Sequence, residues 1–416
     1  MQNRIVLQCA PLVAAWILAH MFSGDAVARI ETRELTGRLS IQSRWYPKTG
    51  AWSNQRSHGS GVVAEPRFYV EDVQGRSFTF APFLRFDAGD EQRTHVDLRE
   101  AYLLFFGEVR NQEWEVRLGV DRVFWGVTES RHLVNIVNQI DLVEHPYKEP
   151  TLGQPMAHFT LSGDWGAVEV FGMTCHRART FPGRSGRLRF PLIVENERVA
   201  YETDAGRWHP ELAARFSRSA GDMDVGVSVF DGISRDPLLL PGIDPGGGPV
   251  LIPHYERIRQ FGLDAQLTAG PWLFKLEALG RAGARDRRGV EEDYVATTLG
   301  GEYTIYSVIG SAADLSVIGE WNYDGRGRNA TNIFQNDLFL AARLAFNDVQ
   351  STEVLGSMMN DFDTTTRVLT FELNRRISGR FSLHLEAIAL LDVDAGDLSY
   401  ASRRDSFLEL HLIYNH

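Results

Sequence analysis

Histidine, serine and acidic side chains are the groups from which a hydrolytic or metal-dependent site is built, so their spacing indicates which chemistry the chain offers. His58 and Ser60 stand close together in the stretch His58-Gly59-Ser60-Gly61. A serine nucleophile needs a sharp turn between a strand and a helix to present its hydroxyl group, and no helical pattern follows this stretch. The 12 histidines contain no His-x-x-x-His pair, which a helical zinc site would require. We therefore expect no enzyme, no metal site and no cofactor.

Phosphate cradles and nucleic-acid surfaces also lack their usual residues. The glycine-rich stretch "GIDPGGGPV" at 242–250 is followed by neither a lysine nor a helix start, both of which a phosphate-binding loop needs. The net charge of −11 argues against nucleic acid as a partner, because such proteins carry a basic surface.

The densest charge of one sign lies in "RARTFPGRSGRLR" at 177–189, which has no acidic residue. Arginine stays protonated and pairs well with carboxylates and phosphates. The stretch could attract an anionic solute such as a uronate or a phosphate ester, or contact lipopolysaccharide phosphates at a cell surface, and the sequence leaves both open. Its basic residues are Arg177, Arg179, Arg184, Arg187 and Arg189.

The elements that must position these residues are strands. In one clear example Trp272, Phe274 and Leu276 alternate with Lys275 and Glu277, and such period-2 alternation is typical of a sheet with one apolar face. We count about 18 similar runs between residue 34 and the C-terminus, with 16 as the alternative number. The chain is therefore predicted to be all-β.

The connections between the runs alternate in length. Tight turns such as Gln74-Gly75 and Ala269-Gly270 alternate along the chain with long stretches such as 125–154 and 175–208. This rhythm places all long loops on one rim and all short turns on the other, as in outer-membrane barrels. We predict a single antiparallel barrel over residues 29–416, with short periplasmic turns and long extracellular loops. A soluble, secreted β-sandwich or β-helix is the alternative.

The N-terminus has the features of a secretory signal. Arg4 precedes a largely apolar stretch at 5–22, and Ala26-Val27-Ala28 fits a cleavage site. We predict a cleaved signal peptide at residues 1–28 and a location in the outer membrane of a Gram-negative bacterium. The implied partners are outer-membrane lipid, lipopolysaccharide and the outer-membrane assembly machinery.

In such a barrel the apolar face of each strand meets lipid and the polar face lines a wet lumen. Glu100 falls on the apolar face of its run, and a β-bulge that shifts the phase would resolve this conflict. The charged residues predicted to line the lumen are Arg38, Arg85, Asp97, Arg99, Glu115, Arg117, Asp121, Lys275, Glu277, Glu302, Glu320, Arg343, Glu372 and Glu386.

Aromatic residues gather near both predicted rims, as expected where strands cross the two membrane interfaces. Near short turns lie Phe106, Trp114, Trp165, Trp272, Tyr303 and Tyr414. Near long loops lie Trp45, Phe230, Tyr255, Tyr294, Trp321 and Phe407.

The third long loop, about 125–154, is the candidate constriction. Leu133, Ile136, Val137 and Ile140 are spaced like one helical stripe, so we expect an amphipathic turn pressed against the barrel wall. The alternative is an extracellular cap against lipopolysaccharide. The residues predicted to form the constriction are Trp125, Glu129, Arg131, His132, Asn135, Asn138 and Asp141.

The stretch "LREAYLLFFGEVRNQEWEVRLGVDRVFWG" at 98–126 resembles bacterial outer-membrane barrels of the alginate-export-like porin group. In that group an Arg-Leu-Gly-Arg-Gln-like segment precedes a Trp-Gly pair that opens the constriction loop. Arg117-Leu118-Gly119 and Trp125-Gly126 match it, whereas Val120-Asp121 replaces Arg-Gln. The resemblance implies the barrel and its constriction loop, but no particular solute.

The sequence thus predicts a passive outer-membrane porin or channel for small hydrophilic solutes, anionic ones among them. Two alternatives stay open: an outer-membrane enzyme or assembly protein with a plugged lumen, and a barrel that binds surface polysaccharide. The direction of transport, the ion selectivity and the oligomeric state have no sequence signal.

Overall fold

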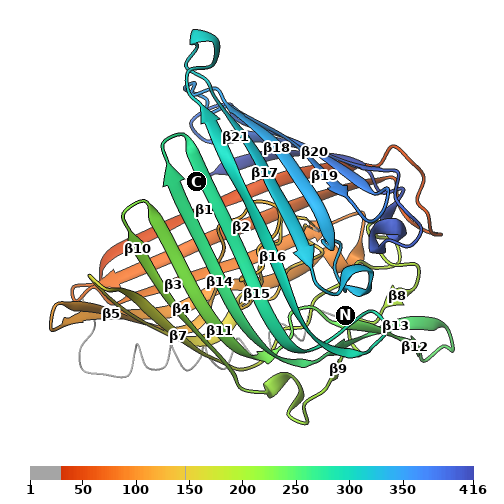
Figure 1. Ribbon diagram of the computed structural model, residues 1–416, viewed down its shortest axis with the longest axis horizontal. Coiled ribbons are helices and arrows are strands. Elements are labelled where there is room, and N and C mark those ends of the chain that lie inside the picture. Colours follow the sequence, from red (N-terminus) through yellow and green to blue (C-terminus); the bar gives the residue numbers. More distant parts are fainter. Residues whose placement is uncertain (1–29, 146) are drawn as a thin grey trace.

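A computed structural model describes residues 30–145 and 147–416, and the predicted signal peptide at 1–28 lies outside the described residues. Eighteen strands form one antiparallel sheet, and β1 pairs with both β2 and β22, so the sheet closes into a barrel (Figure 1). The predicted all-β barrel with about 18 strands is therefore confirmed. Within the described ranges, no helix is both long and apolar enough to cross a membrane.

The barrel strands are between 8 and 16 residues long. The barrel strands are β1 (Ile30–Trp45), β2 (His58–Asp72), β3 (Ser77–Asp87), β4 (His95–Val109), β5 (Gln112–Asp121), β6 (Gln154–Gly163), β7 (Gly166–Met173), β10 (Glu211–Ala220), β11 (Met223–Ile233), β14 (Arg257–Ala269), β15 (Trp272–Arg285), β16 (Glu291–Ile305), β17 (Asp314–Asp324), β18 (Asn336–Ala345), β19 (Glu353–Asp361), β20 (Arg367–Arg376), β21 (Phe381–Leu391) and β22 (Phe407–Asn415). Short 3-10 helices lie in the connections: η1 (Glu91–Arg93), η2 (Gly206–Trp208), η3 (Val308–Gly310), η4 (Gly327–Asn329) and η5 (Leu398–Ser402).

Four further strands form a small separate sheet: β8 (Ile193–Val194), β9 (Ala200–Tyr201), β12 (Leu238–Ile243) and β13 (Pro249–Tyr255). They come from the β7–β10 and β11–β14 connections, and Figure 1 shows them together beyond one end of the barrel strands. Two long loops therefore acquire their own backbone pairing, which the sequence did not suggest.

The predicted alternation of short and long connections is present in the structure. Strands β14 and β15 are joined through Gly270, whose φ of +61° is a left-handed conformation that favours glycine. At the opposite rim, β5 and β6 are separated by residues 122–153. Short turns and long loops thus occupy different rims, as predicted.

Alternation along each strand separates two environments. Phe261 and Val295 point outward and are 55% and 62% exposed, whereas Glu277 points inward and is fully buried. Large apolar side chains thus cover the outer face, and charged ones are held inside the ring of strands.

The predicted bulge near Glu100 is also present. Ala81 pairs with Glu100 and Pro82 with Leu98, so Arg99 is the additional residue in β4. The phase shift turns Glu100 inward, where Arg67 and Arg122 lie 3.0 and 2.8 Å from its carboxylate oxygens. Tyr102 moves to the inner face with it and lies under Arg117. A carboxylate that would be costly on an apolar face is therefore paired inside.

Only part of the predicted aromatic girdles exists. Near the short turns, Trp272 contacts Tyr303 with ring centroids 4.6 Å apart, and near the long loops Trp45 and Trp321 are exposed outward. The prediction is wrong for four residues that are buried instead, because loops cover the inner wall at this rim: Phe230, Tyr255, Tyr294 and Phe407.

Candidate functional site: the lumen and its inward loop

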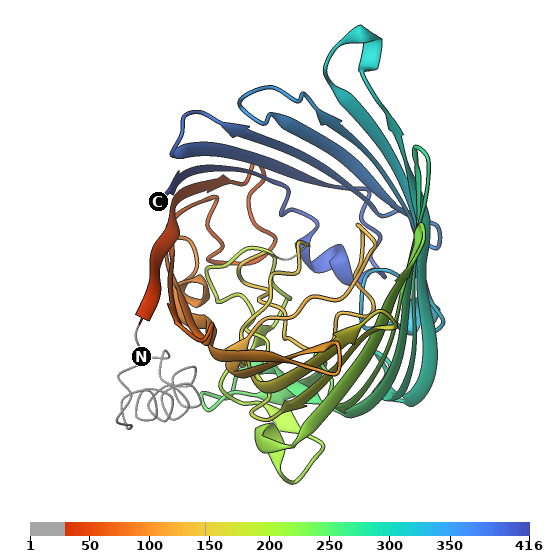
Figure 2. The same ribbon diagram turned by 90° about the vertical axis from the view of Figure 1, so that its left-hand side faces the viewer.

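The described parts of the β5–β6 connection, residues 122–145 and 147–153, lie inside the barrel, and we refer to them as the inward loop. Figure 2 shows irregular segments inside the ring of strands. Wall residues from β15, β17, β20 and β21 all bond to this loop. Strands so far apart in the barrel can be reached only across the lumen.

Trp125 lies near the start of the loop and is turned inward. Its ring packs edge-on against Phe171 of β7 with centroids 5.5 Å apart, and the side chain is 3% exposed. Gly126 follows with a φ of +147°, and a Cβ there would lie 3.0 Å from the Glu277 carboxylate. Glycine is needed at this position because both the backbone conformation and the close approach disfavour a side chain.

An apolar cluster holds the loop against the wall. Leu133, Val134, Ile136 and Val137 are all 5% exposed or less. The predicted helical turn is wrong, since these residues adopt no helix; their backbone groups bond instead to Glu277 and Arg235. The expectation that they press on the wall is confirmed, and their wall partners include Met156, Phe171, Ala213, Phe230, Ile258, Leu279, Tyr294 and Ala296.

Glu277 of β15 is the strongest single anchor of the loop. Its Oε1 accepts hydrogen bonds from the Val127 and Thr128 amides at 2.7 and 3.1 Å, and from the Thr128 hydroxyl at 2.7 Å. Its Oε2 accepts one from the Val134 amide at 3.2 Å. One buried carboxylate therefore satisfies three amides of the irregular backbone stretch, and it also lies within bonding distance of the Thr128 hydroxyl, whose other acceptor is the Arg131 carbonyl at 2.6 Å.

Glu320 of β17 anchors the next residues in the same way. Its two oxygens accept from the Glu129 and Ser130 amides, both at 2.8 Å, and from the Ser130 hydroxyl at 2.6 Å. The Glu129 carboxylate in turn lies 2.8 Å from Lys275 and 3.2 Å from Arg343. Positive wall charges thus meet a negative loop charge at this side of the bore.

The other end of the loop reaches the opposite wall. His145 lies 2.9 Å from Glu386 of β21, and Lys148 lies 3.2 Å from Glu386 and 2.8 Å from Glu372 of β20. Glu144 accepts from Arg85 of β3 at 2.5 Å. The loop therefore crosses the lumen between β15–β17 and β20–β21.

Asp141 and Asn138 fix the shape of the loop. Asp141 accepts from Arg99 at 2.6 Å; burial opposes its charged form, but Arg99 and His95 hold its pKa well below the ordinary value. The buried Asn138 accepts from the Val123 amide and donates to the Asp121 and Leu152 carbonyls. Asn138 thus joins the two chain segments where the loop leaves the wall, and its side-chain amide bonds to backbone groups.

The remaining predicted constriction residues also bond within the protein. Asn135 accepts from the Trp125 amide at 3.3 Å, and Arg131 donates to the Phe334 carbonyl at 3.2 Å. His132 lies 4.0 Å from Glu277. Burial disfavours the charged imidazole, but Glu277, Glu149 and Glu129 outweigh it and raise the pKa of His132.

Many predicted lumen residues face inward but are covered by loops rather than by water. The covered ones are Arg85, Asp97, Arg99, Asp121, Lys275, Glu277, Glu320 and Glu386. Those whose side chains remain partly accessible are Arg38, Glu115, Arg117, Glu302, Arg343 and Glu372. The second group is the charged lining that a solute in the bore would meet, and its part in passage stays a prediction.

The basic stretch at 177–189 is largely neutralised by acids from elsewhere, so it is not the unopposed basic patch that the local sequence suggested. Arg177 pairs with Asp97 at 2.6 Å, Arg179 with Asp236 at 2.7 Å, and Arg187 with Asp405 at 2.7 Å. Arg189 is buried and donates to the Phe190 and Pro191 carbonyls. Arg184 lies 3.8 Å from Asp244, and its side chain is 67% exposed.

One pair that holds the inward loop had no sequence signal. Arg235, in the β11–β14 connection, donates to the Ile136 and Val137 carbonyls at 3.0 and 2.8 Å. The same guanidinium makes two 2.9 Å bonds to Glu211 of β10. Both residues are distant from the loop in sequence, and no local pattern brings them together.

Among residues 30–145 and 147–416 there is no group of three or more His, Cys, Asp or Glu side chains arranged to hold a metal ion. The lumen is instead a network of ion pairs between a closed wall and the loops inside it.

Comparisons with known proteins gave no matching family model and no matching curated protein. Solved structures with some similarity include OprB of Pseudomonas putida, at 8% identity and a TM-score of 0.45, over 92% of this chain and 94% of that one. They also include a triple mutant of the Rhodopseudomonas blastica porin, at 10% identity and a TM-score of 0.43, over 92% of this chain and 100% of that one.

Proposed function

We propose that the protein is a passive outer-membrane channel for small hydrophilic solutes and that the inward loop sets its width. A closed 18-stranded barrel is too wide for wall side chains to fill. The observation that carries the proposal is the anchoring of one loop to Glu277 and Glu320 on one side and Glu386 on the other. A loop tied at both sides narrows the bore at a fixed height.

The outward-facing apolar band supports placement in a bilayer, because backbone groups in lipid must all be paired and a closed barrel pairs them. In that placement, lipopolysaccharide would surround the long-loop rim, and the assembly machinery would have inserted the barrel. The mixed lining, with Arg117 beside Glu115 and Arg343 beside Glu302, is compatible with anionic solutes among those admitted.

Reconstitution of the purified protein in planar lipid bilayers tests the proposal. We expect discrete current steps with a linear current-voltage relation at low voltage, as an open, water-filled bore gives. Insertion without current steps would contradict a channel and favour a barrel with a plugged lumen.

A further inference from the structure

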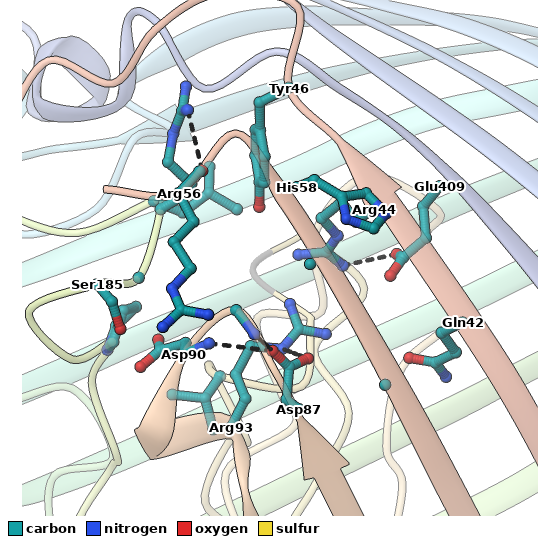
Figure 3. A pocket seen from close by; sticks show the side chains of 18 of the residues that line it. Gln42, Arg44, Tyr46, Arg56, His58, Asp87, Asp90, Arg93, Ser185 and Glu409 are labelled. Carbon is teal, nitrogen blue, oxygen red and sulfur yellow. Dashed lines mark hydrogen bonds and ion pairs between the residues drawn. The ribbon is translucent and has the colours of Figure 1, made fainter. Parts of the chain in front are cut away.

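A small cavity lies at the long-loop rim, and Leu142 and Val143 of the inward loop form part of its lining. It has a volume of about 40 Å³ and is lined by the ends of β1, β2 and β3, the β3–β4 connection and the tip of the β7–β10 connection. Figure 3 shows that Arg44, Arg93 and Asp87 lie around one space, with Ser185 at its edge. A volume of this size holds a few waters or one small ion.

Three guanidinium groups line this cavity, and each has an acidic partner. Arg44 has Glu409 at 2.6 Å, Arg85 and Arg93 share the Oδ2 of Asp87 at 3.2 and 3.1 Å, and Arg85 also pairs with Glu144 at 2.5 Å. The Nε atoms of Arg44 and Arg85 are buried without a hydrogen-bond partner. Buried charged donors without partners are costly, so a further acceptor inside the cavity would stabilise the site.

The electrostatics of Arg93, which lies in η1 outside the barrel strands, point the same way. Burial lowers the pKa of Arg93 to about 10, and repulsion from Arg44 and Arg85 adds to the effect. Both causes oppose the charged form of Arg93, and an anion placed among the three groups would favour that form.

Two glycines leave the space open. Gly59 and Gly61 face the cavity from β2, and a Cβ at Gly61 would lie 3.3 Å from Asp87 and 3.7 Å from Arg85. A Cβ at Gly59 would lie 3.5 Å from Gly89, in ordinary contact. The cavity thus explains the two glycines in the His58-Gly59-Ser60-Gly61 stretch, because larger residues at these positions would fill it.

We propose that this cavity binds one small tetrahedral oxyanion, such as sulfate or inorganic phosphate, between Arg44, Arg85 and Arg93. Guanidinium groups suit this ligand because they donate several bonds in a fixed geometry. The bound ion would join the barrel wall to η1 and to the nearby loop tip. The site does not depend on whether the barrel conducts, so its test is separate from that of the proposed function.

Isothermal titration of the full-length protein in detergent with sulfate tests the site. We expect saturable binding with one ion per chain, weakened at least about tenfold in Arg93→Gln, because one charged donor group is lost. Arg184→Gln is the matched control, since it removes the same charge from an exposed position on the neighbouring loop and should bind sulfate like the wild type. Absence of saturable binding, or equal binding in Arg93→Gln, would overturn the proposal.

Gly59→Val is a second test of the site, because valine fills the cavity without changing its charge and is a residue that strands favour. Heat-modifiable migration on a gel reports whether each variant forms the barrel, and folded Gly59→Val should lose sulfate binding. Competition with glucose 6-phosphate shows whether the site binds a free anion or the phosphate group of an ester. A site of this volume should exclude the ester, so displacement of sulfate by the ester would contradict the assignment to a free ion.

Discussion

Replacing Glu277 by alanine should release the first half of the inward loop from the wall. The carboxylate accepts four hydrogen bonds, from the Val127 amide, both donors of Thr128 and the Val134 amide. The alanine variant leaves the three amides without this partner in a region where Glu277 itself is fully buried, while the Thr128 hydroxyl keeps the Arg131 carbonyl as an acceptor.

The size of the effect follows from the number and type of bonds. Hydrogen bonds to a charged group contribute about 1.5–3 kcal/mol each, but these four share one carboxylate, and lumen water can replace some of them. We therefore expect a loss of about 3–5 kcal/mol, the range seen when one partner of a buried charged pair is removed. That loss raises the detached population of the loop about a hundredfold or more.

Single-channel recording with limited proteolysis measures this change. Glu277→Ala should show a larger mean conductance, frequent current fluctuations and new cleavage within residues 126–137. Glu277→Gln should be intermediate, because its carbonyl oxygen can keep the bonds to Val127 and Thr128 while its amide group opposes the Val134 N–H. Glu65→Ala is the control, since that inward-facing carboxylate pairs with Arg38 and not with the loop.

An unchanged conductance and cleavage pattern in Glu277→Ala would refute the idea that this carboxylate holds the loop. A change of the same size in Glu65→Ala would also refute it, because loss of any lumen charge would then suffice.

Three further predictions concern the loop and the cavity. Trp125→Ala should destabilise the barrel by about 3–5 kcal/mol, measured by urea unfolding, because it empties a packed site beside the wall. The raised pKa of His132 means that its attraction to Glu277 is present at pH 6 and lost as the pH rises through that pKa; current fluctuations should therefore grow towards pH 9, and His132→Gln should remove this dependence. Burial raises the pKa of Asp90 to about 6, so proton uptake between pH 7.5 and 5 removes a negative charge from the cavity edge. Sulfate should therefore bind more tightly at pH 5 than at pH 7.5. If Asp90→Asn kept the full pH dependence of sulfate binding, Asp90 would not be its cause.

The strands could be predicted because each carries its own signal. Apolar and charged residues alternate along a strand, as Trp272, Lys275 and Glu277 do, which indicates that its two faces meet different environments. A closed barrel is the arrangement in which all such strands can pair their backbone groups. Even the bulge at Arg99 could be expected, since Glu100 would otherwise face outward. Inward orientation of the charged wall residues followed from the same alternation.

The loops could not be predicted at the same level, because their partners are distant in sequence. Leu133 to Ile140 has helical spacing, yet the Glu277 carboxylate and Arg235 bond the backbone that a helix would have bonded itself. Likewise, the basic stretch meets Asp97 and Asp405 only in the folded chain. The local sequence shows the charge and polarity of a segment. It does not show which charged residue will lie opposite that segment in the folded chain.

The most direct test of the central claim, that the inward loop sets the width of an open passage, is liposome swelling with neutral sugars of increasing size. Wild-type protein should admit small sugars and exclude larger ones, and Glu277→Ala combined with Glu320→Ala should shift the cut-off to larger sugars. An identical cut-off in both proteins, or no swelling in either, would contradict the claim.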